Sequence, residues 1–406
     1  MEYLNCKAEF LNSRGGFNTA KEIQSQPRLW METYTKLVRE QDSISAFLNN
    51  VLEKDCPYVI LTGAGTSAFI GEALLGPYQK QWGTYTRAIA TTDIITHPGD
   101  YFMRKRTTLL ISFARSGDSP ESLATVELAD RYCDDIYKLN ITCNKEGDLF
   151  RGSSGKNSYV FLLPEETNDR SLAMTSSFSC MLLAGLLILN IRNITTMRPL
   201  VSKLQACGNH ILEQCLADLR KLAESDFKKM LFLGSGPLFG VAHESHLKVQ
   251  ELSDGNIVCI YDSFLGVRHG PRAVVKNDTV IVYLLSNNAH VRKYELDLIR
   301  SVNETSTPFW SLAVGNNLNA RELSIDQTIS FPGGTDDIPE EFQSVFYVLP
   351  AQIMGFFKSL NLGLTPDSPS NSGSITRVVQ GVKIYLGNPA DENHDPVTVD
   401  GKKLGR

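Results

Sequence analysis

The sequence lacks a run of basic residues, and its formal net charge is −5 at pH 7 over 406 residues. A general nucleic-acid-binding protein needs a basic patch, so nucleic acid is not an expected partner. The most apolar stretch, Phe178 to Ile191, is shorter than the roughly 20 residues of a membrane span. It therefore predicts a buried helix and no membrane partner. No basic segment with an apolar core opens the chain, so no signal peptide is expected.

The eight cysteines form no C-x-x-C pair and no Cys/His cluster with the spacing of metal ligands. We expect them to be reduced thiols of a cytoplasmic protein, and we predict no metal site. A hydrophobic content of 42% and a charged content of 21% are typical of a soluble globular protein. The length exceeds that of one ordinary core, which predicts two domains with terminal extensions.

Short apolar runs alternate with helical patterns along most of the chain. The runs at Tyr58 to Thr62, Thr107 to Phe113, Ile136 to Thr142 and Tyr159 to Leu163 predict strands. Strands that alternate with helices predict an α/β fold, in which helices cover both faces of a parallel sheet. Residues 1–50 show helical spacing and predict a helical extension that packs on a neighbour.

The second half of the chain repeats the pattern of the first. Gly63-Ala-Gly65 is matched by Gly234-Ser-Gly236, an offset of 234 − 63 = 171 residues. Three further matches support the offset: Thr108 to Ile111 with Thr279 to Val282 and Lys138 to Thr142 with Phe309 to Ala313 at 171 residues, and Phe161 to Pro164 with Ile329 to Pro332 at 168. We interpret this as two copies of one α/β domain joined by a helix from about Pro199 to Ala223. The predicted domains are residues 51–200 and 201–385, and residues 386–406 form a polar tail.

The segment from Thr107 to Ser122 has the pattern of an anion-binding loop. A buried strand leads into small polar residues around Gly117, and Ser119-Pro120 then starts a helix. This order directs free backbone N–H groups into the loop. Ser116 and Ser119 add hydroxyl groups and Arg115 adds a positive charge, which suits a phosphate monoester. The alternative is an ordinary turn whose serines only cap the helix.

A second glycine-rich loop, Gly63-Ala-Gly-Thr-Ser-Ala68, has the G-x-G-x-x-A pattern of dinucleotide-binding proteins, with Asp93 after the next strand. The motif is weak alone, and a second anion loop would be superfluous for a pyrophosphate. We therefore favour a phosphate site shared by Ser67 and the Arg115 loop. In the second copy, Ser286-Asn-Asn288 lacks the arginine and the glycine, so we expect no anion there.

The second copy carries candidate acid and base residues instead. Glu244, Lys248 and Glu251 are four and three residues apart, so they share one face of a helix. A solvated row of salt bridges would show the same spacing, but apolar residues surround these charges. His269 lies in a Gly/Pro turn, where a histidine is often only a structural donor.

Taken together, these motifs resemble the sugar isomerase (SIS) family of phosphosugar-binding domains, from about Tyr58 to Val382. Gly65-Thr-Ser67, the Ser116 loop, Leu247-Lys248-x-x-Glu251 and His269-Gly-Pro271 resemble in order the isomerase half of glucosamine-6-phosphate synthase. The chain is more similar still to the bacterial galactosamine-6-phosphate deaminase/isomerase family. The runs that carry this similarity are Leu61 to Gly71, Arg115 to Ser122, Ala173 to Ser177 and Arg377 to Gly381.

The resemblance implies two tandem SIS domains with flavodoxin-like or Rossmann-like sheets, and it implies a role for each matched residue. Ser67, Ser116 and Ser119, with Arg115 and Gly117 in the same loop, would bind the sugar phosphate. Glu251 would move a proton between C1 and C2, His269 would open the sugar ring, and Lys248 would lie beside the base. Ala114 and Arg115 replace a serine and a glutamine of the synthase loop. The C-terminal lysine of the synthase has no clear counterpart, and Arg377 is a candidate for it.

The expected substrate is a phosphorylated hexose or hexosamine, and the expected reaction converts galactosamine 6-phosphate to tagatose 6-phosphate and ammonium. This chemistry needs a base, an acid and a phosphate handle, and it requires no metal or organic cofactor. A simple ketose/aldose isomerase of the tagatose 6-phosphate type and a sugar-phosphate sensor without activity remain alternatives. A homodimer or higher homo-oligomer is expected.

Overall fold

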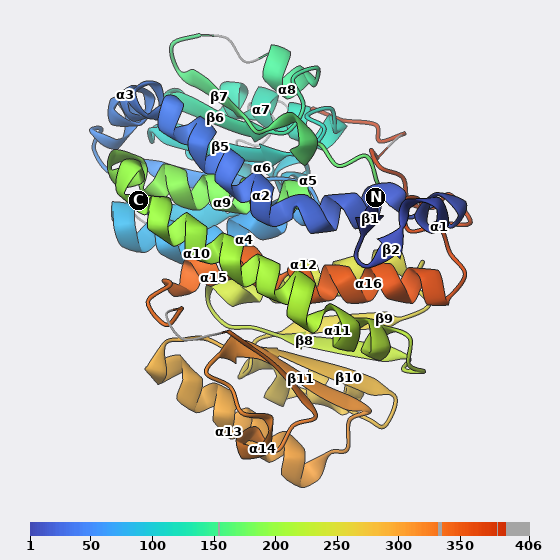
Figure 1. Cartoon of the computed structure of the whole chain (residues 1–406). Coiled ribbons are helices and arrows are strands. Elements are labelled where there is room, and N and C mark those ends of the chain that lie inside the picture. Colours follow the sequence, from blue (N-terminus) through green and yellow to red (C-terminus); the bar gives the residue numbers. More distant parts are fainter. Residues whose placement is uncertain (153–154, 332–334, 380, 387–406) are drawn as a thin grey trace, which may run out of the picture.

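Two five-stranded parallel sheets, one above the other, form the framework of the molecule (Figure 1). The structure is a computed structural model that describes residues 1–152, 155–331, 335–379 and 381–386. Apart from Leu386, the predicted polar tail lies outside the described residues, as do Pro332 and Gln380 of two sequence motifs.

The two sheets share one strand order. The first runs in the order β4 (Tyr85–Ala88), β3 (Tyr58–Thr62), β5 (Thr108–Ala114), β6 (Ile136–Thr142) and β7 (Ser158–Leu162). The second runs in the order β9 (Val258–Asp262), β8 (Lys229–Leu233), β10 (Thr279–Leu284), β11 (Trp310–Asn316) and β12 (Gln327–Phe331). Tyr58 pairs with Thr108 as Lys229 pairs with Thr279, 171 residues later in both strands. The predicted α/β fold of two tandem parallel sheets is confirmed, and the domain boundaries stay predictions.

Helices cover both faces of each sheet, as the alternating pattern predicted. Those of the first half are α4 (Thr66–Trp82), α5 (Thr91–Thr96), α6 (Pro98–Tyr101), α7 (Pro120–Tyr132), α8 (Asp148–Arg151) and α9 (Ser176–Leu189). Those of the second half are α12 (Pro237–Leu252), α13 (Ala289–Thr305), α14 (Ala320–Leu323), α15 (Glu340–Tyr347) and α16 (Leu349–Asn361). Between them, α10 (Arg198–His210), a π-helical turn (Ile211–Cys215) and α11 (Leu216–Ala223) form the predicted linking helix.

The N-terminal segment is helical, and its neighbour is its own chain. A short hairpin of β1 (Glu2–Tyr3) and β2 (Cys6–Lys7), which the sequence did not predict, precedes α1 (Ala8–Ser13), α2 (Phe17–Arg39) and α3 (Gln41–Leu52). Trp30 of α2 is fully buried and donates a hydrogen bond from Nε1 to Ser179 Oγ of α9 at 2.9 Å. The segment is therefore part of the core and belongs structurally to the first domain.

All residues of α9 are buried, which confirms the buried helix predicted at Phe178 to Ile191 with a start two residues earlier. Because every face of α9 packs against protein, the helix needs no polar side. Among the described residues, no single helix has the length and hydropathy of a membrane span. A bent pair, Ser176–Leu189 with Ile191–Ala223, meets those two criteria when its helices are taken together.

The two halves meet where α12 crosses α4, and a glycine sets their separation. A Cβ atom on Gly240 of α12 would lie 2.6 Å from the backbone nitrogen of Ala73 and 2.7 Å from the carbonyl oxygen of Phe69, both in α4. Backbone atoms cannot rotate away as a side chain can, so the contact excludes any larger residue. Gly240 therefore keeps α12 at the distance from α4 that the functional site requires.

We predict that Gly240→Ala destabilises the protein by about 1–3 kcal/mol, because the added methyl group forces the two helices apart. Gly76→Ala in α4 is the matched control, since its Cβ would meet no atom within 4 Å. It should be neutral or stabilising by up to about 1 kcal/mol, through the lower entropy of the unfolded chain. Urea unfolding measures both values. Equal stabilities of the two variants would contradict the role of Gly240.

Candidate active site

A small cavity of about 100 Å³ lies where the chain leaves the carboxyl ends of β3 and β5. The side chains around it include those that the sequence proposed for phosphate, together with Ser122, which the sequence had not assigned: Ser67, Arg115, Ser116, Ser119, Ser122, Met174 and Arg377. Gly117 has a φ of +72°, a backbone conformation that favours glycine. The cavity therefore combines several hydroxyl groups with the N-termini of α4 and α7.

The loop before α7 keeps its backbone donors free, whereas its counterpart before α13 does not. Neither Ser119, at the start of α7, nor Gly65, at the start of α4, caps its helix through a side chain. At α13, Asn288 Oδ1 accepts from the backbone N–H groups of His290 and Val291, and the Glu295 carboxylate accepts from Ser286 N at 3.0 Å. The second loop is thus satisfied by its own side chains, as expected for a loop that binds no anion.

Arg115 lines the cavity, but most of its hydrogen bonds go to the protein. Its Nη1 donates to the carbonyl oxygens of Ser171 and Leu172 at 3.1 and 2.9 Å, and its Nη2 donates to that of Arg377. Burial lowers the pKa of Arg115, while Asp169 acts in the opposite direction. The side chain therefore holds the cavity wall together and adds positive charge beside the loop.

The wall opposite the loop depends on two acidic residues that the sequence did not single out. The Asp169 carboxylate accepts hydrogen bonds from the backbone N–H groups of Thr175 and Ser177 at 2.8 and 2.9 Å. Glu22 of α2 accepts from Arg170 N at 2.6 Å and also binds the Ser171 hydroxyl. Burial, with the charge of Asp169, raises the pKa of Glu22 to about 7. No local motif marks these residues, since their partners become neighbours only in the fold.

Arg377 also reaches this wall from the end of the chain. Its Nε donates to the carbonyl oxygen of Asp169 at 2.8 Å, and its Nη2 donates to Asn168 Oδ1 at 2.7 Å. The sequence had offered Arg377 as a candidate for gripping the open-chain intermediate. In the structure its guanidinium secures the wall of the phosphate cavity.

The face of α12 predicted from the spacing of its charges is buried. Lys248 and Glu244 are fully buried, and the side chain of Glu251 is 22% exposed. The Lys248 Nζ atom lies 2.6 Å from Glu251 Oε2, 3.4 Å from Glu244 Oε1 and 3.2 Å from the Thr66 hydroxyl of α4. A solvated row of salt bridges is therefore excluded. The contact with Thr66 places Glu251 near Ser67, the next residue of α4.

Two carboxylates share one ammonium in this buried group. Burial alone would lower the pKa of Lys248, but the charges of Glu244 and Glu251 together hold it above its ordinary value. Burial raises the pKa of Glu244 to about 8 in spite of the attraction of Lys248. At neutral pH, Glu244 is therefore protonated and Lys248 pairs with an ionised Glu251. An ionised, partly exposed carboxylate is a suitable general base.

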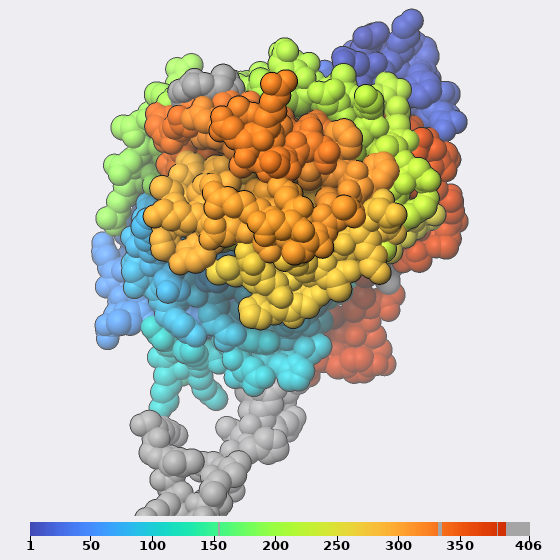
Figure 2. Space-filling view, turned by 90° about the horizontal axis from the view of Figure 1, so that it is seen from below, coloured from blue at the N-terminus to red at the C-terminus, as the bar shows by residue number. Residues whose placement is uncertain are grey.

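His269 is not brought to this group within one chain. It is exposed, in a short 3-10 helix at Gly266–His269. Phe264 and Val267 beside it pack in the cluster with Leu231 and Leu233, whereas α12 packs on the other face of the same sheet. Among the described residues, no hydrogen bond or ion pair joins His269 to Glu251. Figure 2 shows the yellow and orange segments that follow α12 on the face turned away from the first domain.

No protein-family model matches the chain. The D-galactosamine-6-phosphate deaminase AgaS of Shewanella sp. (strain ANA-3) is 40% identical over 393 residues, 94% of this chain and 95% of that protein. The crystal structure of a proposed tagatose-6-phosphate ketose/aldose isomerase from Clostridium novyi NT has a TM-score of 0.90 at 38% identity, over 95% of this chain and 99% of that one. Tagatose-6-phosphate ketose/aldose isomerase from Escherichia coli has a TM-score of 0.82 at 34% identity, over 91% and 96%.

We predict that Glu244→Gln removes part of the pH dependence of stability. The pKa of Glu244 is about 8 in the native state and near 4.5 when unfolded. Between these values the native state holds a proton that the unfolded state has released, so stability falls as pH rises, by at most about 1.4 kcal/mol per pH unit. Glutamine resembles the protonated acid and does not titrate. Relative to the variant, the wild type should therefore lose stability from pH 5 to 8.

Urea unfolding at several pH values between 5 and 8 measures this difference. Glu304→Gln, at an exposed position of α13, is the matched control and should keep the wild-type slope. A Glu244→Gln variant whose stability varies with pH as the wild type does would show that Glu244 is ionised in the native state.

Proposed function

Since the chain belongs to the family of D-galactosamine-6-phosphate deaminases, we propose that it converts galactosamine 6-phosphate and water to tagatose 6-phosphate and ammonium. The observation that carries the proposal is the contact between Lys248 Nζ and the Thr66 hydroxyl at 3.2 Å. It fixes the candidate base, Glu251, beside the helix start that carries Ser67. A phosphate handle and a base thus lie within one site of the right chemistry.

The phosphate of the substrate would lie in the cavity before α7. Ser67, Ser116 and Ser119 would donate their hydroxyl hydrogens to it, and the first backbone N–H groups of α4 and α7 would add to the binding. Ser122 is hydrogen-bonded to Ser119, with 2.6 Å between the two hydroxyl oxygens, and would orient it. Holding the phosphate places the other end of the hexose near Glu251.

Once the sugar ring is open, C1 carries an aldehyde and C2 carries the amine and the proton to be moved. Glu251 would remove the proton from C2 and return it to C1, while the aldehyde oxygen gains a proton. The result is an imine at C2. Water adds to this imine and the C–N bond breaks, which yields the ketose phosphate and ammonia, protonated in solution. Hydrolysis of a C–N bond would therefore complete an aldose–ketose isomerisation.

His269, the candidate acid for ring opening, would come from a second copy of the chain. Sheet 2 separates the His269 turn from α12 in the chain itself, and the histidine is exposed for contact with a partner. We therefore propose a homo-oligomer of at least two chains in which each site combines residues from two subunits. Its setting would be the catabolism of amino sugars in the cytoplasm.

The second candidate function is a ketose/aldose isomerase that releases no ammonia. The printed names of the two solved relatives favour it. The two activities differ in the substituent at C2, and ammonia release separates them. A sensor that binds sugar phosphates without reaction is the third alternative, and it would need the cavity but not Glu251.

We predict that the wild-type protein releases ammonia from galactosamine 6-phosphate with formation of equal amounts of tagatose 6-phosphate. Glu251→Gln should lower kcat by about 10²- to 10⁴-fold, because the base is lost, and should leave phosphate binding intact. A coupled ammonia assay and chromatography of the sugar phosphates measure both products. Tagatose 6-phosphate without ammonia, or no product at all, would refute the deaminase proposal.

Two variants separate phosphate binding from the chemistry in the same assay. Ser116→Ala should raise KM and lower kcat/KM by about 10- to 100-fold, since a hydrogen bond to a charged group is lost. Asn287→Ala, in the corresponding loop of the second sheet, is the matched control and should leave KM unchanged. An equal loss in both variants would argue against the first loop as the phosphate site.

We predict that Glu251→Gln and His269→Ala, each inactive alone, regain activity when the two purified variants are mixed and allowed to exchange subunits. Mixed oligomers would contain sites with an intact Glu251 from one chain and an intact His269 from the other. In a dimer, about a quarter of all sites would be intact after random exchange. Confirmed subunit exchange without any recovery of activity would show that both residues act within one chain.

A further inference from the structure

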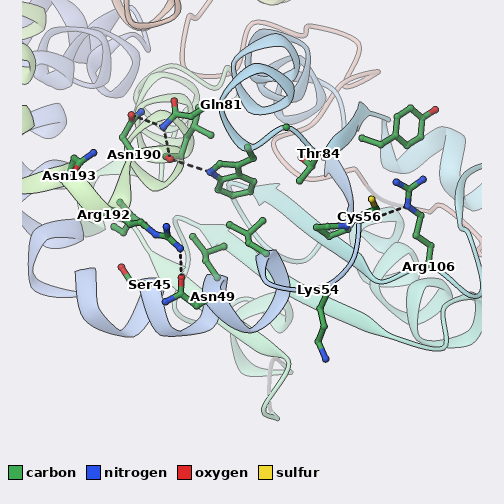
Figure 3. A pocket seen from close by; sticks show the side chains of 18 residues that line it. Ser45, Asn49, Lys54, Cys56, Gln81, Thr84, Arg106, Asn190, Arg192 and Asn193 are labelled. Carbon is green, nitrogen blue, oxygen red and sulfur yellow. Dashed lines mark hydrogen bonds between the residues drawn. The ribbon is translucent and has the colours of Figure 1, made fainter.

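A cavity of about 590 Å³ lies on the first domain, at the end of the sheet opposite the phosphate loop. The segments before β3, β4 and β5 border it, together with α3 and the ends of α4 and α9 (Figure 3). The phosphate loop follows the carboxyl ends of the same strands, so the two sites are separated by the length of the sheet. A volume of this size is typical of small-molecule sites.

The charges around this cavity are all positive. Lys54, Arg106 and Arg192 line it, and no aspartate or glutamate does. None of the three cations forms an ion pair with any of the described residues. Arg106 donates from Nε to the carbonyl oxygen of Cys56, and Arg192 donates from Nη2 to Asn49 Oδ1, so both retain further N–H donors. In a chain with a net charge of −5, such a group of unpaired cations indicates an anionic ligand.

Helix C-termini could explain the cations in another way, because α3, α4 and α9 all end at this cavity. Their last carbonyl groups, however, already have neutral donors. The Leu189 oxygen of α9 accepts from Gln81 Nε2 at 3.0 Å and Trp82 Nε1 at 3.3 Å, and Gly83 N bonds back to Gln79 O at the end of α4. Asn49 O of α3 accepts from Glu53 N. The cationic groups are thus not needed to satisfy the helix ends.

The remaining lining suits a flat, partly polar ring. Apolar and aromatic side chains supply contact area, and four carboxamide groups can donate and accept hydrogen bonds at a ring edge. The former are Leu48, Leu52, Trp82 and Ile191, and the latter are Asn49, Gln81, Asn190 and Asn193. In Figure 3, Gln81 and Asn190 lie together on one side of the cavity and Arg106 lies on the opposite side.

We propose that this cavity binds a small organic phosphate with a heteroaromatic ring, a ligand of the nucleoside monophosphate class. The phosphate would bind the Lys54, Arg106 and Arg192 cations, and the ring would contact Trp82 and the carboxamides. The site is separate from the proposed catalytic residues. It would therefore bind an effector and not the substrate.

Isothermal titration calorimetry of the full chain with adenosine monophosphate tests the proposal, with adenosine and inorganic phosphate as partial ligands. Adenosine monophosphate should bind with a Kd below about 1 mM. Each partial ligand should bind at least about 10-fold more weakly, since it lacks either the charge or the ring. Lys54→Ala/Arg192→Ala should weaken binding by at least about 10-fold and leave the basal turnover unchanged.

Two further variants identify the site. Lys293→Ala/Arg321→Ala removes two exposed cations of the second domain that have no ion pair among the described residues, and it should bind as the wild type does. Ser116→Ala should also retain binding. No binding of adenosine monophosphate, equal binding of adenosine, binding unaffected by Lys54→Ala/Arg192→Ala, or binding lost in Ser116→Ala would each overturn the proposal.

Discussion

The burial of the Lys248 ammonium is the constraint on which both the fold and the candidate site depend. An isolated charge in a protein interior is costly, so it must be paired and hydrogen-bonded. Two partners, Glu244 and Glu251, lie on its own helix, and the third, Thr66, starts the helix of the other domain. The two domains can satisfy this lysine only when α12 lies close against α4. The packing of the domains and the position of the base therefore have one physical cause.

The same constraint explains why two similar sheets perform different tasks. In each half, a central strand ends in a loop and a helix start, where backbone N–H groups need acceptors. Before α13 the chain supplies them itself, through Asn288 and the buried Glu295, whose pKa burial raises to about 7. Before α7 small residues leave the donors open. An anion can thus be bound only in the half whose helix α4 contacts the base through Lys248.

The sequence was informative wherever structure follows from local pattern. The strands at Tyr58–Thr62 and Ile136–Thr142 appear at the predicted residues, because each is a short apolar run buried on both faces. The shared face of α12 also followed from spacing alone. What local pattern could not reveal is which distant groups satisfy a buried charge. Arg115 was predicted to bind phosphate, yet its strongest visible partners are three carbonyl groups from residues 171, 172 and 377. The contributions of Glu22 and Asp169 were missed for the same reason.

These distant partners imply that the phosphate cavity depends on both ends of the described chain. The N-terminal helix α2 contributes Glu22, which fixes the wall at Arg170 and Ser171, and its first turn is tied to the C-terminal segment, since Asp367 accepts from the backbone N–H groups of Asn18 and Thr19 at 3.1 and 2.8 Å. Ten residues later, Arg377 closes the same wall. Two α/β domains alone would carry every serine of the loop but not the wall that faces it. The terminal segments are therefore part of the site, although neither carries a residue that would take part in proton transfer.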